Sequence, residues 1–481
     1  MAETAAKHLP PNRMGTEPIQ PLLIKTSIPM VISMMVQALY NIIDSLFVAR
    51  IEEDALTAVS LAFSMQNLMI AVAIGTGVGF SALVSKSLGE RNFEMANYAA
   101  NNAIPLYAIT YLFFFVAGLT LVEPFFELQH ASANITQYGN DYMKLVLLCS
   151  FGMLMQICLE RMLLATGKTF YSMITQATGA IINCIMDPIL IFGLLGAPRL
   201  GVKGAAIATI FGQIIAAGLA LFFNLKYNKE LTLAFRYMKL KASVVRRIYA
   251  VGLPSIIMAS IGSFMVFGLN RILMAFTSTA AAVFGAYFKL QSFIFMPIFG
   301  INNGMVPIVA YNYGARNKAR VLETVKYAAM YAIGIMLIGL ILFETIPGPL
   351  LKFYDASPEM LAIGIPALRI IATHFLIAGA AIMMSSSFQA LGNGVYSMIV
   401  SILRQMVALL PAAYLLSLTG NLNMVWWAFP IAEVVSFLTC CFFMRKIVRE
   451  KLNFGSEPDA AEPMKSGSEQ EEIQSVATGR D

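Results

Sequence analysis

Long apolar runs, separated by short charged or turn-rich segments, follow one another along nearly the whole chain. A helix needs roughly 20 apolar residues to cross the hydrocarbon core of a bilayer, and twelve runs reach that length. The pattern therefore predicts an all-α membrane protein with twelve transmembrane helices. These are expected over residues 22–48, 57–85, 96–121, 139–165, 171–196, 201–225, 248–276, 280–308, 321–346, 361–391, 396–418 and 423–446.

The twelve predicted helices form two sets of six that are related in sequence. Residues 225 positions apart match at many places without any gap. Six helices repeated in one orientation indicate two pseudo-symmetric lobes related by an axis along the membrane normal, with a substrate site in or between them. The matched pairs include Pro29 with Pro254, Gln66 with Gln291, Gly79 with Gly304, Gly89 with Gly314, Arg91 with Arg316, and Asn92 with Asn317.

Changes in composition divide the chain into five parts. Residues 1–20 are polar and lack the apolar core of a signal peptide, so they are expected to form a cytoplasmic amino-terminal tail. The first lobe is predicted at 21–225, a basic cytoplasmic linker at 226–247 and the second lobe at 248–451. The polar segment 452–481 is expected to be disordered.

Composition supports lipid as the solvent for most of this surface. Hydrophobic residues make up 58% of the 481 residues and charged residues only 12%, against about 25% charged in a soluble domain. The net charge of +6 is carried mostly by short loops, which argues against nucleic acid as a partner. The five cysteines lie in or beside apolar runs without a C-x-x-C pair, so neither disulfides nor a metal site are implied.

The distribution of Lys and Arg predicts the orientation. Basic residues are concentrated on the side of the two tails and the linker, and cytoplasmic loops carry this excess. We therefore expect a multi-pass protein of the cytoplasmic (plasma) membrane with both termini in the cytoplasm. The opposite side carries only Arg50, Lys144, Arg199, Lys203 and Lys352.

Ionisable residues inside the predicted helices require an explanation, because a charge at the bilayer centre costs about 2.5–3.5 kcal/mol on insertion scales. In the first lobe these residues are Asp44, Asp187 and the adjacent Glu160 and Arg161. The 225-residue offset relates Asp44 to Leu269 and Asp187 to Ala412. The fold thus does not require carboxylates at these places, which favours a function confined to the first lobe.

Asp44 shares one helical face with Tyr40 and Asn41, and Asn183 lies one turn before Asp187. Two carboxylates with amide and hydroxyl oxygens form either a proton-sharing cluster or a site for a hard cation such as Na⁺, here at Asp44, Asn183 and Asp187. The alternative is that they only fix helix packing. Further candidates are Tyr142 and Thr209 as oxygen donors, Glu160, for which a pair with Arg161 near the membrane surface is the alternative, and Pro29 as a helix kink.

Charges in the second lobe are better explained by structure. We expect Lys289 and Glu433 to neutralise each other and Arg271 to reach the membrane surface. Asp141 and Lys144 are expected to pair at the outer edge of their helix. Arg369, His374 and Arg404 could line a water-filled cavity.

Catalytic motifs are missing from the sequence. It contains no H-E-x-x-H, G-x-S-x-G or P-loop pattern. We therefore expect no enzyme, no ATP-driven transport by this chain alone, and no cofactor or permanent metal beyond transient H⁺ or Na⁺.

Several short motifs follow one another along about residues 20–450. They are Pro29, Tyr40 to Asp44, Gly89 to Asn92, Gly167 and Lys168, Asn183, Asp187 and Pro188, Gly201 to Ala206, and Tyr311 to Arg316. Taken in this order, they resemble the multidrug and toxic compound extrusion (MATE) family, in the branch typified by the damage-inducible F protein. The resemblance implies export of lipophilic, mostly cationic organic compounds in exchange for H⁺ or Na⁺. It also implies that Tyr40, Asp44, Tyr142, Asn183, Asp187 and Thr209 couple ions and lie near substrate.

Three other functions are alternatives to ion-coupled export. A flippase for lipid-linked oligosaccharide precursors, from the same wider superfamily, would need a large cationic cavity. An intramembrane enzyme lacks its catalytic residues, and a membrane scaffold leaves Asp44 and Asp187 without a reason. The sequence thus predicts a monomeric secondary antiporter that works by alternating access in the lipid bilayer on small organic substrates.

Overall fold

The computed structural model describes residues 12–129, 131–354 and 356–454, and the described part is helical throughout, without strands. Within these ranges, ten helices are long and apolar enough to cross a membrane, and the number is twelve when each of two bent helix pairs counts as one span. The predicted all-α fold is confirmed. The first part of the chain contains α2 (Arg13–Thr16), α3 (Ile19–Ala49), α4 (Glu53–Gly89), α5 (Phe93–Thr120), α6 (Val122–Leu128), α7 (Ala133–Leu148), α8 (Phe151–Ala165), α9 (Thr169–Phe192) and α10 (Val202–Tyr227).

The second part repeats this order with two modifications near its end. A π-helical segment, η3 (Leu403–Leu409), interrupts the eleventh span, and the short helix α19 (Leu422–Trp426) precedes the last one. Its helices are α11 (Ala242–Met274), α12 (Ser278–Gly314), α13 (Lys318–Thr345), α14 (Pro347–Lys352), α15 (Pro358–Ala372), α16 (Phe375–Ala390), α17 (Gly394–Ile402), α18 (Leu410–Ser417) and α20 (Ala428–Glu450).

The sequence repeat is also a repeat of local structure. Five helices of the first lobe, α4, α5, α6, α7 and α9, begin 225 residues before their counterparts α12, α13, α14, α15 and α17. The Asn92 side chain caps α5, and Asn317, 225 residues later, caps α13 in the same way. The bends match as well, at 46° between α7 and α8 and 50° between α15 and α16.

Glycines bring the two lobes together in symmetric pairs. A Cβ atom on Gly89 would lie 1.9 Å from the carbonyl oxygen of Tyr311, and one on Gly314 would lie 2.0 Å from that of Lys86. Lys86 and Tyr311 are themselves 225 residues apart, so one contact is made twice with the lobes exchanged. The ends of α4 and α12 approach so closely because neither glycine has a side chain.

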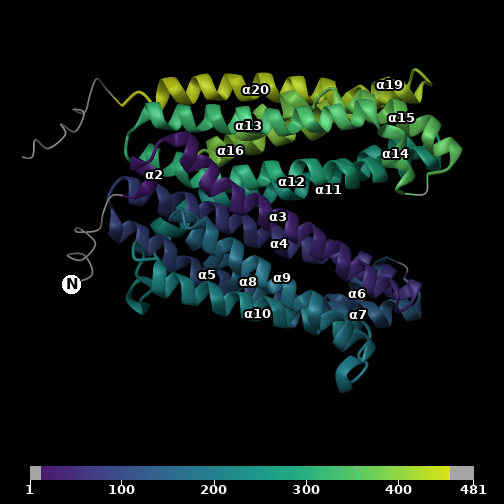
Figure 1. The fold of residues 1–481 in the computed structure, drawn as a ribbon, viewed down its shortest axis with the longest axis horizontal. Helices are drawn as coiled ribbons and strands as arrows, with labels where there is room; N and C mark the ends of the chain where they lie inside the picture. The colour runs from purple at the N-terminus through teal and green to yellow at the C-terminus, as the bar shows by residue number, and fades with distance from the viewer. Residues whose placement is uncertain (1–11, 130, 355, 455–481) are drawn as a thin grey trace, which may run out of the picture.

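Figure 1 shows the helices in two groups that meet where α2 lies and diverge toward the opposite end. We call the end that holds α2 the α2 side. Each group has its own buried core, but the first residues of α3, including Leu22 and Leu23, pack in the core of the second lobe. Conversely, Val244 and Ile248 at the start of α11 pack in the core of the first lobe. These two helices thus tie the lobes together near the α2 side.

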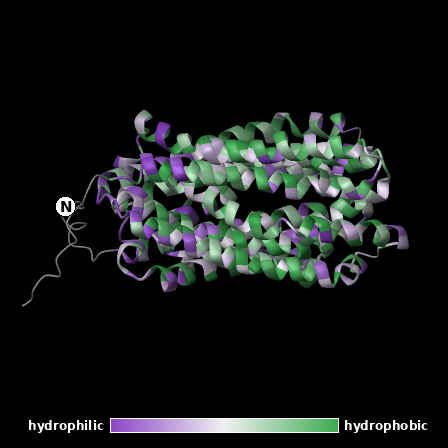
Figure 2. Ribbon diagram, turned by 90° about the horizontal axis from the view of Figure 1, so that it is seen from above, coloured by the Kyte–Doolittle hydropathy of each residue, from purple (hydrophilic) through white to green (hydrophobic). Residues whose placement is uncertain are grey.

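Hydrophobic residues dominate the middle of the helices and hydrophilic residues gather at both ends (Figure 2). Large apolar side chains also point outward, for example Phe113 at 63% and Phe267 at 70% exposure. Such outward-facing apolar surface is stable only in contact with lipid.

The segment between the lobes follows a fixed path across α5. Three asparagines of this helix, Asn97, Asn101 and Asn102, exchange hydrogen bonds with the backbone of residues 232–241. The basic linker is therefore held against the first lobe.

Several details differ from the sequence-based boundaries. The fourth and tenth predicted helices are each two helices joined at a bend. The tail predicted at 1–20 contains α2 and the start of α3, with Met14 buried. Leu452, assigned to the disordered tail, is buried in the core of the second lobe, whereas residues 455–481 lie outside the described part.

Candidate ion and substrate site

The two candidate aspartates lie on neighbouring helices near the side opposite α2. Asp44 is five residues before the end of α3, and Asp187 is five residues before the end of α9. Asp187 is completely buried, and Asp44 is half-buried. The two carboxylates are close enough to interact electrostatically, so the structure brings together the pair that the sequence singled out.

Asn183 links Asp187 to α10. Its amide nitrogen donates to Asp187 Oδ2 at 3.0 Å, and its oxygen accepts from Thr209 Oγ1 at 3.0 Å, in the amide orientation that satisfies both neighbours. Asn183 and Thr209 are buried at 2% and 5% exposure. The predicted grouping of an amide, a hydroxyl and a carboxylate is thus present as one hydrogen-bonded cluster.

Two tyrosines complete this cluster. Tyr40 is within hydrogen-bond reach of Thr209 and interacts electrostatically with both aspartates. Tyr142, on α7, interacts with Asp44 and Tyr40, and its hydroxyl accepts a hydrogen bond from Gln66 Nε2 at 3.5 Å. Oxygen atoms from four helices, α3, α7, α9 and α10, therefore meet at one site. We call it the first-lobe site, and it consists of Tyr40, Asp44, Tyr142, Asn183, Asp187 and Thr209.

The site has unused acceptors. Among the described residues, neither Asp44 Oδ1 nor Asp187 Oδ1 has a hydrogen-bond partner, and both atoms are buried. Buried carboxylate oxygens without partners are unfavourable unless a proton or a cation neutralises them. The donor set is made of oxygen atoms, which suits either a proton or a hard cation such as Na⁺.

Asn41 belongs to a different polar row. Its side chain is exposed and accepts from Gln37 Nε2 at 3.5 Å. Gln37 in turn accepts from Gln176 Nε2 at 3.3 Å, and Ser33 donates to Gln176. This row runs along α3 and α9 toward the α2 side. Gln37 was not among the candidates predicted from the sequence, although it lies one turn before Asn41 on the same face.

Glu160 forms its hydrogen bonds outside the first-lobe site. It is buried at 9% exposure, and its Oε1 accepts from Gln156 Nε2 and from Thr175 Oγ1, both at 3.0 Å. The alternative of a surface pair with Arg161 is wrong, because Arg161 Nη1 donates to Asn303 of the second lobe at 3.2 Å. Pro29 is buried within α3, and the helix continues through it.

For Glu433, Lys289 and Asp141, the partners predicted from the sequence are wrong. Glu433 pairs with Arg404 Nη1 at 3.4 Å, whereas the exposed Lys289 lies over the ring of Tyr354. Asp141 pairs at 3.2 Å with Lys203 at the start of α10 rather than with Lys144 on its own helix α7. Depth in the membrane does not identify these partners, because each pair depends on how neighbouring helices are rotated.

Arg271 and Arg369 both lie at the surface. Arg271, close to the end of α11, is exposed as expected. Arg369 pairs with Glu344 at the surface. Of the three basic groups expected to line a cavity, only His374 and Arg404 do so.

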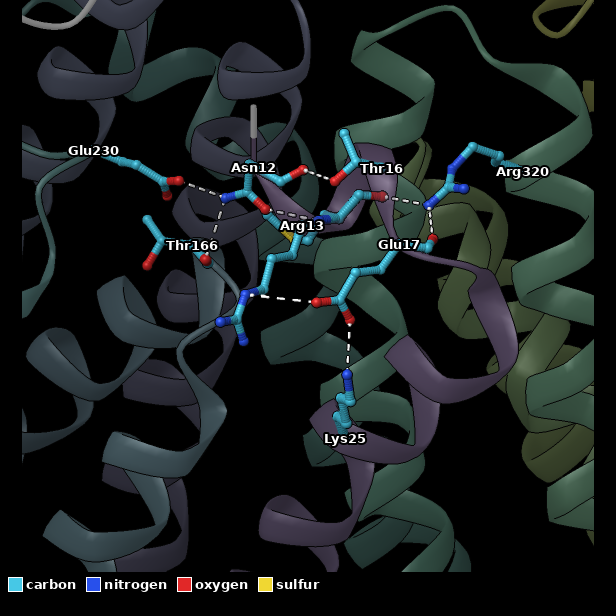
Figure 3. Close-up of polar contacts among 9 residues, drawn as sticks. Asn12, Arg13, Thr16, Glu17, Lys25, Thr166, Glu230 and Arg320 are labelled. Atoms are coloured by element: carbon cyan, nitrogen blue, oxygen red, sulfur yellow. Dashed lines mark hydrogen bonds and ion pairs between the residues drawn. The ribbon is translucent and has the colours of Figure 1, made fainter. Parts of the chain in front are cut away.

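On the α2 side, the segment 12–17 bridges the two lobes (Figure 3). Asn12 Nδ2 donates to Glu230 Oε1 at 2.7 Å and to the Thr166 carbonyl at 3.4 Å, both in the first half of the chain. The carbonyl of Met14 accepts from Asn312 at 2.8 Å and from Arg320 at 3.0 Å, and both donors belong to the second lobe.

Further contacts strengthen this bridge. Arg320 also donates to the Glu17 carbonyl at 2.7 Å, and the Glu17 carboxylate pairs with Arg13 and Lys25. The Met14 side chain is buried at 1% exposure. The α2 side is therefore closed by a segment that contacts both lobes.

Comparisons with known proteins agree with this architecture. The model of the MatE family matches residues 29–189 and 254–415. The multidrug export protein MepA of Staphylococcus haemolyticus is 26% identical over 423 residues, which cover 88% of this chain and 91% of that protein. An FAD transporter of Shewanella oneidensis is 25% identical over 439 residues, covering 89% and 95%.

Solved structures share the fold. An outward-facing multidrug resistance MATE family transporter of the MOP superfamily superposes with a TM-score of 0.86 at 24% identity, covering 92% of this chain and 98% of the other. A MOP superfamily transporter from Pyrococcus furiosus gives 0.85, also at 24% identity, with coverage of 91% and 97%. The family match spans both lobes and includes Asp44 and Asp187. This chain is thus a membrane transporter rather than an enzyme, and it belongs to the MatE family.

Proposed function

We propose that the chain is a secondary active antiporter that exports lipophilic, mostly cationic organic compounds in exchange for H⁺ or Na⁺. The observation that carries the proposal is the first-lobe site, where the two carboxylates each keep one buried oxygen without a partner among the described residues. No Lys or Arg of the described residues forms an ion pair with Asp44 or Asp187. The site is therefore suited to a mobile cation.

Coupling follows from competition for this negative charge. A proton or Na⁺ that enters from the side opposite α2 neutralises Asp44 and Asp187, which removes the attraction for a cationic substrate and favours its release there. When the ion leaves on the α2 side, the charge returns and a new substrate can bind. Each ligand shifts the conformational equilibrium only by its different affinity for the two states.

Alternating access requires the α2 side to open. The segment 12–17 and the glycine contacts between α4 and α12 close it in this structure. Opening must break the hydrogen bonds of Asn12 and Arg320, and Pro29 lies in α3 downstream of them, where the missing N–H weakens the helix. The proposed orientation puts this side and both termini in the cytoplasm of a monomeric plasma-membrane protein.

Dye uptake into inverted vesicles tests the coupling. With a cationic dye present, we expect accumulation when a pH gradient or a Na⁺ gradient is imposed and none without a gradient. The two gradients, applied separately, identify the ion. Uptake that needs neither gradient would contradict the antiport.

The FAD transporter among the relatives supports a second candidate, export of an anionic flavin dinucleotide. The same vesicles distinguish it, because FAD would then compete with uptake of labelled flavin and leave the cationic dye unaffected. The carboxylates of the first-lobe site favour the cationic substrate.

A further inference from the structure

A second polar cavity lies in the other lobe and has no part in the coupling described above. It has a volume of about 70 Å³ and is formed by residues of α11, α12, η3 and α20 together with His374 at the bend between α15 and α16. Its lining includes the rings of Phe284, Tyr287 and Phe429. Like the first-lobe site, it lies nearer the side opposite α2, because Glu433 is close to the start of α20.

This cavity is rich in hydrogen-bond acceptors. Glu433 is buried at 3% exposure, and its Oε1 has no partner among the described residues. The hydroxyl of Tyr287, buried at 1%, also has none. His374 hydrogen-bonds the Ile371 carbonyl through Nδ1. Because a carbonyl only accepts, Nδ1 carries a proton, and Nε2 is an acceptor when the ring is neutral.

One internal cation occupies part of this cavity. Arg404 approaches Glu433 Oε2 with a single nitrogen at 3.4 Å, and about a third of its side chain is exposed. Arginine–carboxylate pairs that stabilise a fold are usually shorter and bidentate. Arg404 is also carried by the π-helical segment η3, and such segments occur often at functional sites.

We propose that this cavity is a second substrate-binding site, specific for the protonated amine of a ligand, and that Arg404 takes the place of that amine when no ligand is bound. An ammonium group has three N–H donors, and Glu433, His374 and Tyr287 offer three acceptors. The aromatic rings attract its charge. The inference rests on the proposed export of cationic compounds and names the chemical group that a second pocket recognises.

The size of the cavity limits what enters it. At about 70 Å³ the cavity is far smaller than the roughly 300–1,000 Å³ of pockets that enclose drug-sized ligands, so it accommodates an ammonium head group but not a whole drug. The remainder of the ligand would extend past Phe288, which is 45% exposed. Displacement of Arg404 would enlarge the space.

The two tryptophans of the chain provide a local signal, because Trp426 and Trp427 directly precede α20. The experiment is a fluorescence titration of the purified full chain in detergent with 2-phenylethylammonium, which does not absorb at tryptophan excitation wavelengths. Uncharged 2-phenylethanol is the matched control. We expect a saturable change with the amine and none with the alcohol. Identical responses to the two probes would overturn the proposal.

Substitutions separate a binding site from a structural ion pair. Glu433→Gln should weaken amine binding at least about tenfold, since it removes a charged hydrogen-bond partner, and Glu433→Asp should restore part of it. Arg404→Gln should strengthen binding several-fold, because the internal competitor is lost. A purely structural pair predicts lower melting temperatures for both variants without tighter binding by Arg404→Gln, and that result would overturn the proposal.

Asp187→Asn distinguishes this inference from the proposed antiport. It removes a carboxylate of the first-lobe site and should leave the tryptophan titration unchanged. Loss of the titration in Asp187→Asn but not in Glu433→Gln would place the amine in the first lobe and refute the second site. Conversely, a failed dye-uptake experiment with an intact Glu433-dependent titration would refute only the antiport.

Discussion

Asp44 and Asp187 are held in different ways although they belong to one site. Asp187 is completely buried and accepts from Asn183, which Thr209 in turn orients. Asp44 is half-buried on α3 and keeps a free oxygen. A rigid member and a more accessible member suit the ion binding and release that we propose for this site.

Replacement of either aspartate by asparagine should abolish coupled export and leave the fold intact. Asparagine keeps the shape but neither exchanges a proton nor provides a full charge for a cation. Loss of gradient-driven dye transport with normal expression and a monodisperse elution profile is the expected result for Asp44→Asn and Asp187→Asn. Lys289→Gln is the control and should retain export, since Lys289 is exposed and outside both pockets. Export by Asp44→Asn at the wild-type rate would refute the first-lobe mechanism.

Glu230, in the segment between the lobes, should give the α2 side a pH dependence. Its burial raises the pKa of the carboxyl group above the ordinary value of 4.5, while Lys168 and the hydrogen bond from Asn12 oppose that shift. A carboxyl whose folded-state pKa is raised stabilises the fold below its unfolded pKa, and this contribution is lost as pH rises through the folded value.

Glu230→Gln removes this dependence and keeps an acceptor for Asn12. The melting temperature of the variant minus that of the wild type should therefore be higher at pH 8 than at pH 5. The change in this difference reflects Glu230 alone. Thermal unfolding in detergent at several pH values measures it. A difference that is constant across this range, or that changes in the opposite direction, would contradict the burial argument.

At the scale of elements, small residues decide how closely helices approach. The ends of α4 and α12 meet through Gly89 and Gly314, where an added Cβ would lie within 2.0 Å of a backbone oxygen. Backbone cannot move aside as a flexible side chain does, so the contact depends on these two glycines. Since the pseudo-symmetry repeats the contact, the same substitution at Gly89 or at Gly314 should change the stability by a similar amount.

Gly89→Ala and Gly314→Ala should each destabilise the protein by about 1–3 kcal/mol, the range for overpacking. Gly218→Ala in α10 and Gly334→Ala in α13 are matched controls, because nothing lies within 4 Å of an added Cβ at either position. The controls should gain about 0.5–1 kcal/mol from helix propensity. Melting temperatures of the four variants measure the contrast, and tolerance of alanine at Gly89 would show that the lobes do not meet there.

For the whole molecule, the two lobes interlock on the α2 side. The first residues of α3 and α11 pack in the opposite lobe's core, and α2 binds both lobes. The first-lobe site and the second-lobe cavity both lie toward the other side of the membrane.

The proposed orientation has a direct test in the basic linker. A cysteine that replaces Ala234 should stay unlabelled by a membrane-impermeant thiol reagent in intact cells and react after the cells are opened. The five native cysteines are first replaced, and a cysteine at Lys352, on the opposite side, provides the externally labelled control. Labelling of the Ala234 cysteine in intact cells would invert the topology.

The sequence by itself determined the number of spans, the repeat and the side chains that meet in the first-lobe site. Each depends on local features: the length of apolar runs, matches at a constant offset, and side chains one helical turn apart such as Tyr40 and Asp44 or Asn183 and Asp187. Such local patterns predict the folded structure correctly because an apolar run in lipid must form a helix to satisfy its backbone hydrogen bonds.

Only the tertiary structure decided which distant groups meet. Glu433 pairs with Arg404 instead of Lys289, Arg161 reaches Asn303, and the segment 12–17 bridges lobes rather than forming a free tail. These contacts depend on the rotation of helices about their axes and on the bends near Ser150 and His374. The length of an apolar run predicts neither the rotation nor the bend of a helix, because lipid contacts any apolar face equally well. Close packing between helices determines both.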